Sequence, residues 1–274
     1  MPPRYDQRFR VRSYELGAAA EVRTDTYLNY LEEAGVQASA SLGYDYDWYT
    51  THQRLWVARK LFIHYYQPAR IDDELSLTTW ISETRRVQAY REYELRRVNT
   101  GDLLLRARHL WVFLNAVTML PTRVPTEFAD SFVPTEKADS LQIDMTDLTP
   151  LTKPSVEYTA RNSTRYYELD QNKHVNNAVY VQWAEQSIIQ VLRAHNWLPD
   201  SWQTGHMQRI ARETDYLRSL QDSEPYQITT RIQATGPDKI LWLTDIAYAG
   251  TGDSIAQDRL LCRVSSELRQ TLLG

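Results

Sequence analysis

The sequence predicts an α+β protein that consists of two tandem copies of one unit, each a long central helix wrapped by a curved antiparallel β-sheet. The first observation is an internal repeat, because Tyr14-Glu-Leu16 recurs as Tyr167-Glu-Leu169 at an offset of 153 positions (167 minus 14). The second is that each copy has one helix-period apolar run followed by a series of strand-like runs. The 274 residues are enough for two domains of about 100–150 residues each.

The first copy begins with a strand-like segment, Phe9 to Leu16, followed by a helix predicted from about Asp25 to Leu42. Apolar residues at helical spacing indicate this helix, and Gly43 is suited to end it. Four strands are predicted next, at residues 56–66, 74–83, 88–98 and 103–114. In the fourth strand Arg106 and Arg108 alternate with apolar residues, which predicts a sheet with one buried face.

A segment with five prolines between Pro121 and Pro154 follows, and it is expected to connect the two copies. The second copy repeats the pattern with a strand-like segment at Thr164 to Leu169 and a helix from Asn177. Its further strands are predicted at residues 208–217, 226–235, 240–249 and 255–268. The expected organisation is an N-terminal domain at 1–120, a connecting segment at 121–155 and a C-terminal domain at 156–274.

Three polar residues, Asp170, Asn172 and His174, occupy every second position directly before the second helix. In an extended segment, side chains at i, i+2 and i+4 point to the same side, so these three would converge on one point. We therefore expect an extended segment that carries the catalytic residues. Asx residues also cap helices and close turns, and that purely structural role is the alternative for Asp170 and Asn172.

The helix that follows has one apolar stripe, and either Asn176 or Asn177 is suited to cap it. The free N–H groups of a first helical turn stabilise negative charge, including the oxyanion of a carbonyl under attack. We therefore expect Asn176 and Asn177 to mark an oxyanion site beside the three polar residues.

The first copy lacks these polar residues. At the same offset, Gly17, Ala19 and Glu21 stand where the second copy has Asp170, Asn172 and His174. A purely structural set should recur together with its helix. Its presence in one copy favours a single active site in the second half of the chain.

Composition excludes several classes of function. A formal net charge of -4 argues against a general nucleic-acid-binding protein. No apolar run approaches the ~18–20 residues that a membrane span needs, and the first residues have no apolar signal core. A cytoplasmic protein is therefore expected, and the single cysteine agrees with a reducing compartment.

Cys262 itself is expected on the buried face of the last strand as a small apolar residue, with no base nearby to make it a nucleophile. The histidines lack metal-ligand spacing, and the sequence has neither a glycine-rich phosphate loop nor a Gly-x-Ser-x-Gly elbow. We therefore expect an enzyme without a metal or other cofactor.

Several motifs in both halves resemble the acyl-acyl carrier protein thioesterases of bacteria and plants. In the first half they are residues 9–17, 29–33, 55–59, 77–81 and 106–112; in the second they are residues 170–177, Tyr180, Trp183, Asp215 and Tyr216. His174-Val-Asn-Asn177 alone is shared by many hot-dog thioesterases, whereas the combination is much more specific.

The resemblance implies two tandem hot-dog domains, with the catalytic Asp, Asn and His of the family at Asp170, Asn172 and His174. It also implies an N-terminal domain that shapes the acyl-chain pocket, release of free fatty acid by hydrolysis, and acyl carrier protein as the partner. A membrane or nucleic acid is not expected as a partner. The oligomeric state is left open, with a homodimer as one alternative.

The sequence departs from the plant members at one place. They carry a Glu-Cys pair three residues beyond the Tyr of the Asp215-Tyr216 strand, and here those positions are Ser219 and Leu220. A cysteine nucleophile is excluded at that site, so direct hydrolysis by an activated water is expected. Three alternatives stay open: a hot-dog hydratase, an acyl-CoA thioesterase, and a non-catalytic acyl-binding module.

An acidic carrier protein would need a local basic surface on a chain of net negative charge. The candidates for that surface are Arg85, Arg86, Arg91, Arg209, Arg212 and Arg218.

Overall fold

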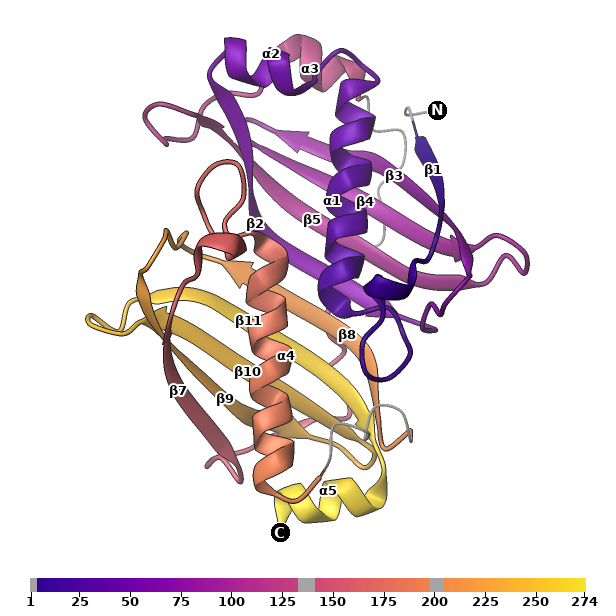
Figure 1. Ribbon diagram of the computed structural model, residues 1–274, viewed down its shortest axis with the longest axis vertical. Coiled ribbons are helices and arrows are strands. Elements are labelled where there is room, and N and C mark those ends of the chain that lie inside the picture. The colour runs from indigo at the N-terminus through magenta and orange to yellow at the C-terminus, as the bar shows by residue number, and fades with distance from the viewer. Residues whose placement is uncertain (1–3, 133–140, 198–204) are drawn as a thin grey trace. The chain divides into compact units, whose positions relative to one another are not determined.

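The computed structural model describes residues 4–132, 141–197 and 205–274 (Figure 1). The chain divides into two compact units. Unit 1 comprises Met1–Glu15 and Thr26–Leu141, and unit 2 comprises Leu16–Asp25 and Gln142–Gly274. The short segment Leu16–Asp25 therefore comes from the first sequence copy and belongs to the second unit.

Unit 1 contains an antiparallel sheet with the strand order β1-β3-β4-β5-β2 and the long helix α1 (Thr24–Ala40), whose first two residues group with unit 2. The strands are β1 (Tyr5–Arg10), β2 (Arg54–Tyr65), β3 (Glu74–Arg85), β4 (Gln88–Arg97) and β5 (Leu103–Asn115). The short helices α2 (Tyr46–Thr51) and α3 (Thr126–Ser131) and the 3-10 turn η1 (Ser13–Glu15) complete it.

Unit 2 repeats this plan with the order β8-β11-β10-β9 and the helix α4 (Asn177–Ala194). The strands are β6 (Thr149–Pro150), β7 (Glu157–Ser163), β8 (Met207–Tyr216), β9 (Pro225–Thr235), β10 (Lys239–Tyr248) and β11 (Ser254–Val264). Both β6 and β7 pair with β9. The 3-10 turn η2 (Tyr166–Glu168) precedes α4, and α5 (Ser266–Leu273) ends the chain.

The two sheets have the same register. In unit 1, Arg91 of β4 pairs with Ile81 of β3 and His109 of β5. In unit 2, Trp242 of β10, 151 positions after Arg91, pairs with Ile232 of β9 and Leu260 of β11. This correspondence, and the long helix that each unit contains, confirm the predicted fold, two tandem hot-dog domains of the α+β class.

Three predicted elements are wrong. The segment Phe9 to Leu16 is a strand only up to Arg10, where β1 ends, and it contains the 3-10 turn η1, since the carboxylate of Glu15 accepts from the N–H of Arg12 at 2.7 Å. The last strand ends at Val264, because Ser265 caps a new helix through its side chain, which accepts a hydrogen bond from the N–H of Leu268. The segment Thr164 to Leu169 is not a strand but contains the 3-10 turn η2, since the carboxylate of Glu168 folds back to accept from the N–H of Arg165 at 2.8 Å.

The proline-rich segment 121–155 is divided between the units. Its first part, with α3, groups with unit 1, and the part from Gln142, with β6, groups with unit 2. Residues 133–140 of the expected connection lie outside the described residues. No helix among the described residues has both the length and the apolar character of a membrane span.

The core of unit 2 is mostly aliphatic and includes Cys262, which is fully buried beside Leu260 and Val264. Burial raises the pKa of the Cys262 thiol to about 12. The prediction that this cysteine is a core residue is confirmed, and its thiol is protonated at neutral pH.

We expect Cys262→Ser to lower the stability of the protein by about 1–3 kcal/mol, because the new hydroxyl would be buried among apolar side chains. Thermal unfolding of both proteins measures this. In the native wild type, iodoacetamide should leave Cys262 unmodified, and mass spectrometry showing rapid stoichiometric alkylation would contradict the assignment.

Candidate active site

The segment from Asp170 to His174 forms a tight turn, so the prediction that it is extended is wrong. Leu169 and Val175 pair as an antiparallel bridge at its base. Inside the bridge, the N–H of Asp170 donates to the carbonyl of His174 at 2.8 Å, and the N–H of Lys173 donates to the carbonyl of Asp170 at 3.0 Å. Lys173 adopts a positive φ of 62°, which the reversal of the chain requires.

The turn nevertheless brings the three polar residues together around the carboxylate of Asp170. One oxygen, Oδ1, accepts from the N–H of Asn172 at 2.7 Å and from the N–H of His174 at 3.3 Å. The other, Oδ2, lies 3.4 Å from Nδ2 of Asn172. Within the described parts of the chain, neither ring nitrogen of His174 has a hydrogen-bond partner. Asp170 and His174 are partly exposed, so a reactant could contact them.

Helix α4 begins directly behind this turn. Asn176 is the residue that caps it, since its side-chain oxygen accepts from the N–H of Ala178 at 2.8 Å. The side-chain oxygen of Asn177 is buried and has no hydrogen-bond partner among the described residues. The first turn of α4 thus places a helix N-terminus and a buried amide next to His174.

The turn is attached to the loop after β8, which carries Ser219 and Leu220. The N–H of Val175 donates to the carbonyl of Leu220 at 2.8 Å, and the N–H of Leu220 donates to the hydroxyl of Tyr180 at 3.1 Å. The side chain of Leu220 is fully buried. Ser219 and Leu220 therefore belong to a loop that is hydrogen-bonded to the polar turn, and the side chain of Leu220 contributes packing.

The first sequence copy forms the same turn with other side chains. Leu16 pairs with Val22, the N–H of Gly17 donates to the carbonyl of Glu21 at 2.9 Å, and the N–H of Ala20 donates to the carbonyl of Gly17 at 3.0 Å. Ala20 has a φ of 55°, like Lys173. The backbone conformation therefore does not require Asp, Asn and His.

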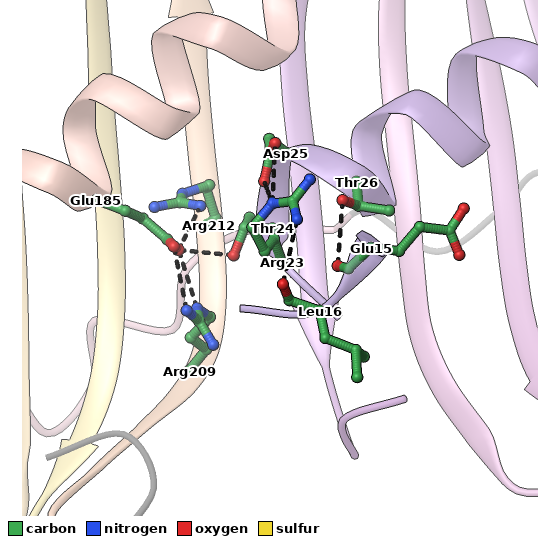
Figure 2. Close-up of polar contacts among 9 residues, drawn as sticks. All are labelled: Glu15, Leu16, Arg23, Thr24, Asp25, Thr26, Glu185, Arg209 and Arg212. Atoms are coloured by element: carbon green, nitrogen blue, oxygen red, sulfur yellow. Dashed lines mark hydrogen bonds and ion pairs between the residues drawn. The ribbon is translucent and has the colours of Figure 1, made fainter. Parts of the chain in front are cut away.

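The start of the first helix serves a structural purpose that the sequence pattern did not reveal (Figure 2). The hydroxyl of Thr24, at the position of Asn177, donates to Glu185 of α4 at 2.7 Å within unit 2. Glu185 also receives bonds from Nε of Arg209 at 2.9 Å and Nη1 of Arg212 at 3.1 Å. The fully buried Arg212 lies 3.1 Å from Asp258 as well. These contacts fix α4 against β8 and β11.

This network settles the charge of Glu185. Burial alone would raise the pKa of its carboxyl, but Arg209, Arg212 and the Thr24 hydroxyl outweigh burial and lower the pKa from 4.5 to about 2. Glu185 is therefore ionised throughout the physiological range, and both arginines have a compensating charge.

The basic surface predicted for a carrier protein is only partly on the surface. Arg91 and Arg212 are 5% and 0% exposed, and Arg209 is engaged by Glu185, so these three are unavailable to a partner. Burial of such long polar side chains depends on the packing of distant strands, which strand alternation does not reveal. Arg85, Arg86 and Arg218 are exposed as predicted.

Two family models match the chain. The model of the acyl-ACP thioesterase N-terminal domain matches residues 2–132, and that of the acyl-ACP thioesterase C-terminal domain matches residues 152–233. The fold, two hot-dog domains in one chain, and these two matches together define the class of protein as a two-domain thioesterase. The chain belongs to the acyl-ACP thioesterase family.

Known relatives agree with this assignment. The chain is 26% identical to an oleoyl-acyl carrier protein thioesterase of Coriandrum sativum, over 97% of this chain and 78% of that protein. It is 28% identical to the acyl-[acyl-carrier-protein] hydrolase FATB2 of Cuphea viscosissima, over 67% of this chain and 47% of that protein. The match therefore spans about half the length of the Cuphea relative.

Solved structures share the fold. A putative oleoyl thioesterase of Lactobacillus plantarum has a TM-score of 0.80 at 17% identity, over 96% of this chain and 97% of the other. The 12:0-ACP thioesterase of Umbellularia californica has a TM-score of 0.75 at 18% identity, over 96% and 94%.

We expect Glu185→Gln to destabilise the protein at neutral pH by about 3–5 kcal/mol, because it removes a charge that compensates the buried Arg212 and the partly buried Arg209. The depressed pKa means that the wild-type contribution is present above pH 4.5 and is lost as the pH falls towards about 2. Thermal unfolding between pH 2 and 7 should therefore show a smaller acid loss in the variant. Glu267→Gln, at an exposed position, is the control; equal behaviour of the two variants would contradict the assignment.

Proposed function

We propose that this protein hydrolyses fatty acyl thioesters of acyl carrier protein and releases the free fatty acid. Membership of the family supports this activity, and the names of the two plant relatives describe the same reaction for those proteins. The protein would act without a metal or organic cofactor, and the second unit would carry out the chemistry.

The observation that carries the proposal is the difference between two identical turns. The turns at Gly17–Glu21 and Asp170–His174 have the same backbone hydrogen bonds, yet only the second combines a carboxylate with an amide and an imidazole, whereas the first has Glu21 alone among Gly and Ala. Because the fold is satisfied by Gly, Ala and Glu at these positions, the polar set is free to serve chemistry.

The reaction needs a base, a means to orient water, and stabilisation of an oxyanion. Water attacks the thioester carbonyl carbon while Asp170, Asn172 and His174 hold the water, and either the carboxylate of Asp170 or the imidazole of His174 accepts its proton. The negative charge that forms on the carbonyl oxygen is stabilised by the N-terminus of α4 near Asn176 and Asn177. The C–S bond then breaks, the sulfur leaves as a thiol after taking up a proton, and the acid is released.

A water nucleophile suits this site better than a covalent mechanism. The position of the plant cysteine is Leu220, whose side chain is buried. Cys262 is buried in the core and its thiol has a raised pKa, so it cannot act as a nucleophile there.

Coenzyme A is the second candidate carrier, because it shares the phosphopantetheine arm with acyl carrier protein. The exposed residues Arg161 and Arg165, which precede the turn, favour the acidic carrier protein by charge. A cytoplasmic location and a homodimer remain part of this proposal.

We expect His174→Ala and Asp170→Ala to lower kcat by about 10²–10⁴-fold, the usual contribution of general-base assistance. A sharper variant replaces Asp170, Asn172 and His174 by Gly, Ala and Glu, the residues of the first turn. This triple variant should lose hydrolysis and keep its fold, as judged by circular dichroism and thermal unfolding.

The matched control is Ala19→Ser, which changes the corresponding position of the first turn and should leave kcat nearly unchanged. Retention of near wild-type kcat by both single variants of the second turn, with a saturating acyl thioester, would refute the assignment of the site.

Charge reversal at Arg161 and Arg165 should raise KM for acyl carrier protein thioesters while kcat changes little, because a docking surface acts on association and not on the reacting bond. The effect should fade as salt screens the charges over a Debye length of ~8–10 Å. The control is Arg193→Glu at the other end of α4, ~24 Å from its start. A KM that responds to neither salt nor charge would make coenzyme A the natural carrier.

A further inference from the structure

The interior of unit 1 holds a cation and an imidazole at positions where unit 2 is apolar. Arg91 and His109 are neighbours across β4 and β5, and the matching residues of unit 2 are Trp242 and Leu260. All four are buried: Arg91 is 5% exposed and the other three 0%. The fold therefore accepts apolar side chains at both positions, and neither polar residue is required by the architecture.

The helix side of unit 1 differs in the same way. Gly35 and Ser39 of α1 stand where α4 has Ile188 and Leu192, two fully buried core residues at the offset of 153 positions. A Cβ on Gly35 would lie 3.4 Å from Cδ of Arg91. Helix α1 therefore passes directly over the side chain of Arg91, and the small residue leaves it room.

Within the described part of the chain, Arg91 contacts only neutral groups. Its Nη1 and Nη2 lie 3.5 and 3.4 Å from the hydroxyls of Thr79 and Ser39, and its guanidinium lies 5.5 Å from the ring of Phe132. Among the described residues, no Asp or Glu forms an ion pair with it. The buried arginine of unit 2, Arg212, has both Glu185 and Asp258. Guanidinium stays protonated in proteins, so Arg91 is a buried positive charge without a carboxylate partner among the described residues of unit 1.

The imidazole of His109, which pairs with Arg91 across β4 and β5, is a second buried polar group. Both ring nitrogens are buried without a hydrogen-bond partner among the described residues. Burial, with a further contribution from the charge of Arg91, lowers the pKa of His109 to about 3. The ring is therefore neutral and carries one N–H donor. Arg91 and His109 together offer hydrogen-bond donors and one positive charge.

Apolar surface adjoins this charge. Phe132, which contacts the Arg91 guanidinium, belongs to a buried aromatic cluster with Phe113 and Phe128, against which Tyr44 and Trp56 pack. A ligand that matches both the positive charge of Arg91 and the aromatic cluster has one negative charge and an apolar chain. A dianion such as a phosphate monoester would leave one charge unbalanced in the interior.

We propose that Arg91 and His109 of unit 1 form a binding site for the carboxylate of an aliphatic carboxylic acid, whose chain packs against the aromatic cluster around Phe132. The guanidinium donates to the carboxylate oxygens in the manner that makes arginine effective for planar anions. This inference goes beyond the proposed hydrolysis and does not depend on it, because binding is measured without turnover.

Such a carboxylate has two sources. It belongs either to a free fatty acid, or to the far end of an acyl chain that is bound through a thioester at its other end. Dodecanoate represents the first source, and the 11-carboxyundecanoyl thioester of N-acetylcysteamine represents the second. Dodecan-1-ol and the dodecanoyl thioester are the uncharged counterparts of the same chain lengths.

Isothermal titration of the full chain with these four compounds tests the proposal. At least one carboxylate should bind the wild type about 10–100-fold more tightly than its uncharged counterpart, the range expected for hydrogen bonds to a charged group. Arg91→Met should remove this preference. The compound that shows it identifies the source of the carboxylate. For the two thioesters, His174→Ala takes the place of the wild type, so that the compounds are not hydrolysed during the titration.

Stability provides the matched comparison. Arg91→Met should keep or raise the Tm of the ligand-free protein, because it removes a buried charge that has no ion pair among the described residues. Arg212→Met should lower the Tm, because it leaves Glu185 and Asp258 uncompensated. His109→Leu, the residue of unit 2, serves as the second variant and should also weaken binding of the carboxylate.

The proposal is overturned if dodecanoate binds the wild type no better than dodecan-1-ol and the carboxyl-ended thioester binds His174→Ala no better than the dodecanoyl thioester, since Arg91 is intact in both proteins. It is equally overturned if Arg91→Met keeps the preference for carboxylate. If the wild type does not hydrolyse acyl thioesters, the proposed function is wrong, but the binding of a carboxylate at Arg91 is unaffected.

Discussion

The antiparallel bridge between Leu169 and Val175 is the constraint on which the candidate site depends. It closes a turn that sets Asp170 against the backbone of Asn172 and His174 and delivers the chain directly to the N-terminus of α4. Because the N–H of Val175 also bonds to Leu220, the turn is fixed to the sheet as well as to the helix. A rigid turn of this kind positions side chains without requiring strain from them.

Comparison of the two sequence copies distinguishes residues that the fold requires from residues that only the candidate active site requires. The bridge Leu16–Val22 and its turn repeat the backbone of the second copy with Gly17, Ala19 and Glu21 at the three positions of the polar residues. In place of chemistry, the start of the first helix supplies Thr24 to the buried carboxylate of Glu185. One backbone motif has thus become a candidate active site in one copy and a structural anchor in the other.

The same comparison distinguishes two buried arginines. Arg212 is surrounded by Glu185 and Asp258, and a buried ion pair with good hydrogen bonds offsets much of its desolvation cost. Arg91 lies among hydroxyls and aromatic rings, where that cost is not offset by a carboxylate of the described chain. Unit 2 thus balances its buried arginine with two carboxylates, whereas the described residues of unit 1 surround Arg91 with neutral groups.

The sequence by itself determined the two copies, the long helices, the main strands and the presence of the polar residues in one copy, because these features follow from local periodicity and from comparison within the chain. Only the tertiary structure decided that Asp170–His174 turns back on itself, that Arg91 and Arg212 are buried, and that Leu16–Asp25 groups with unit 2. Strands that are distant in sequence determine whether a side chain is buried and which residue it pairs with, so neither can be predicted from the residues next to it in the chain. The glutamate that compensates Arg212 lies 27 positions away on a helix, and the residue that matches Arg91 is a tryptophan in the other unit.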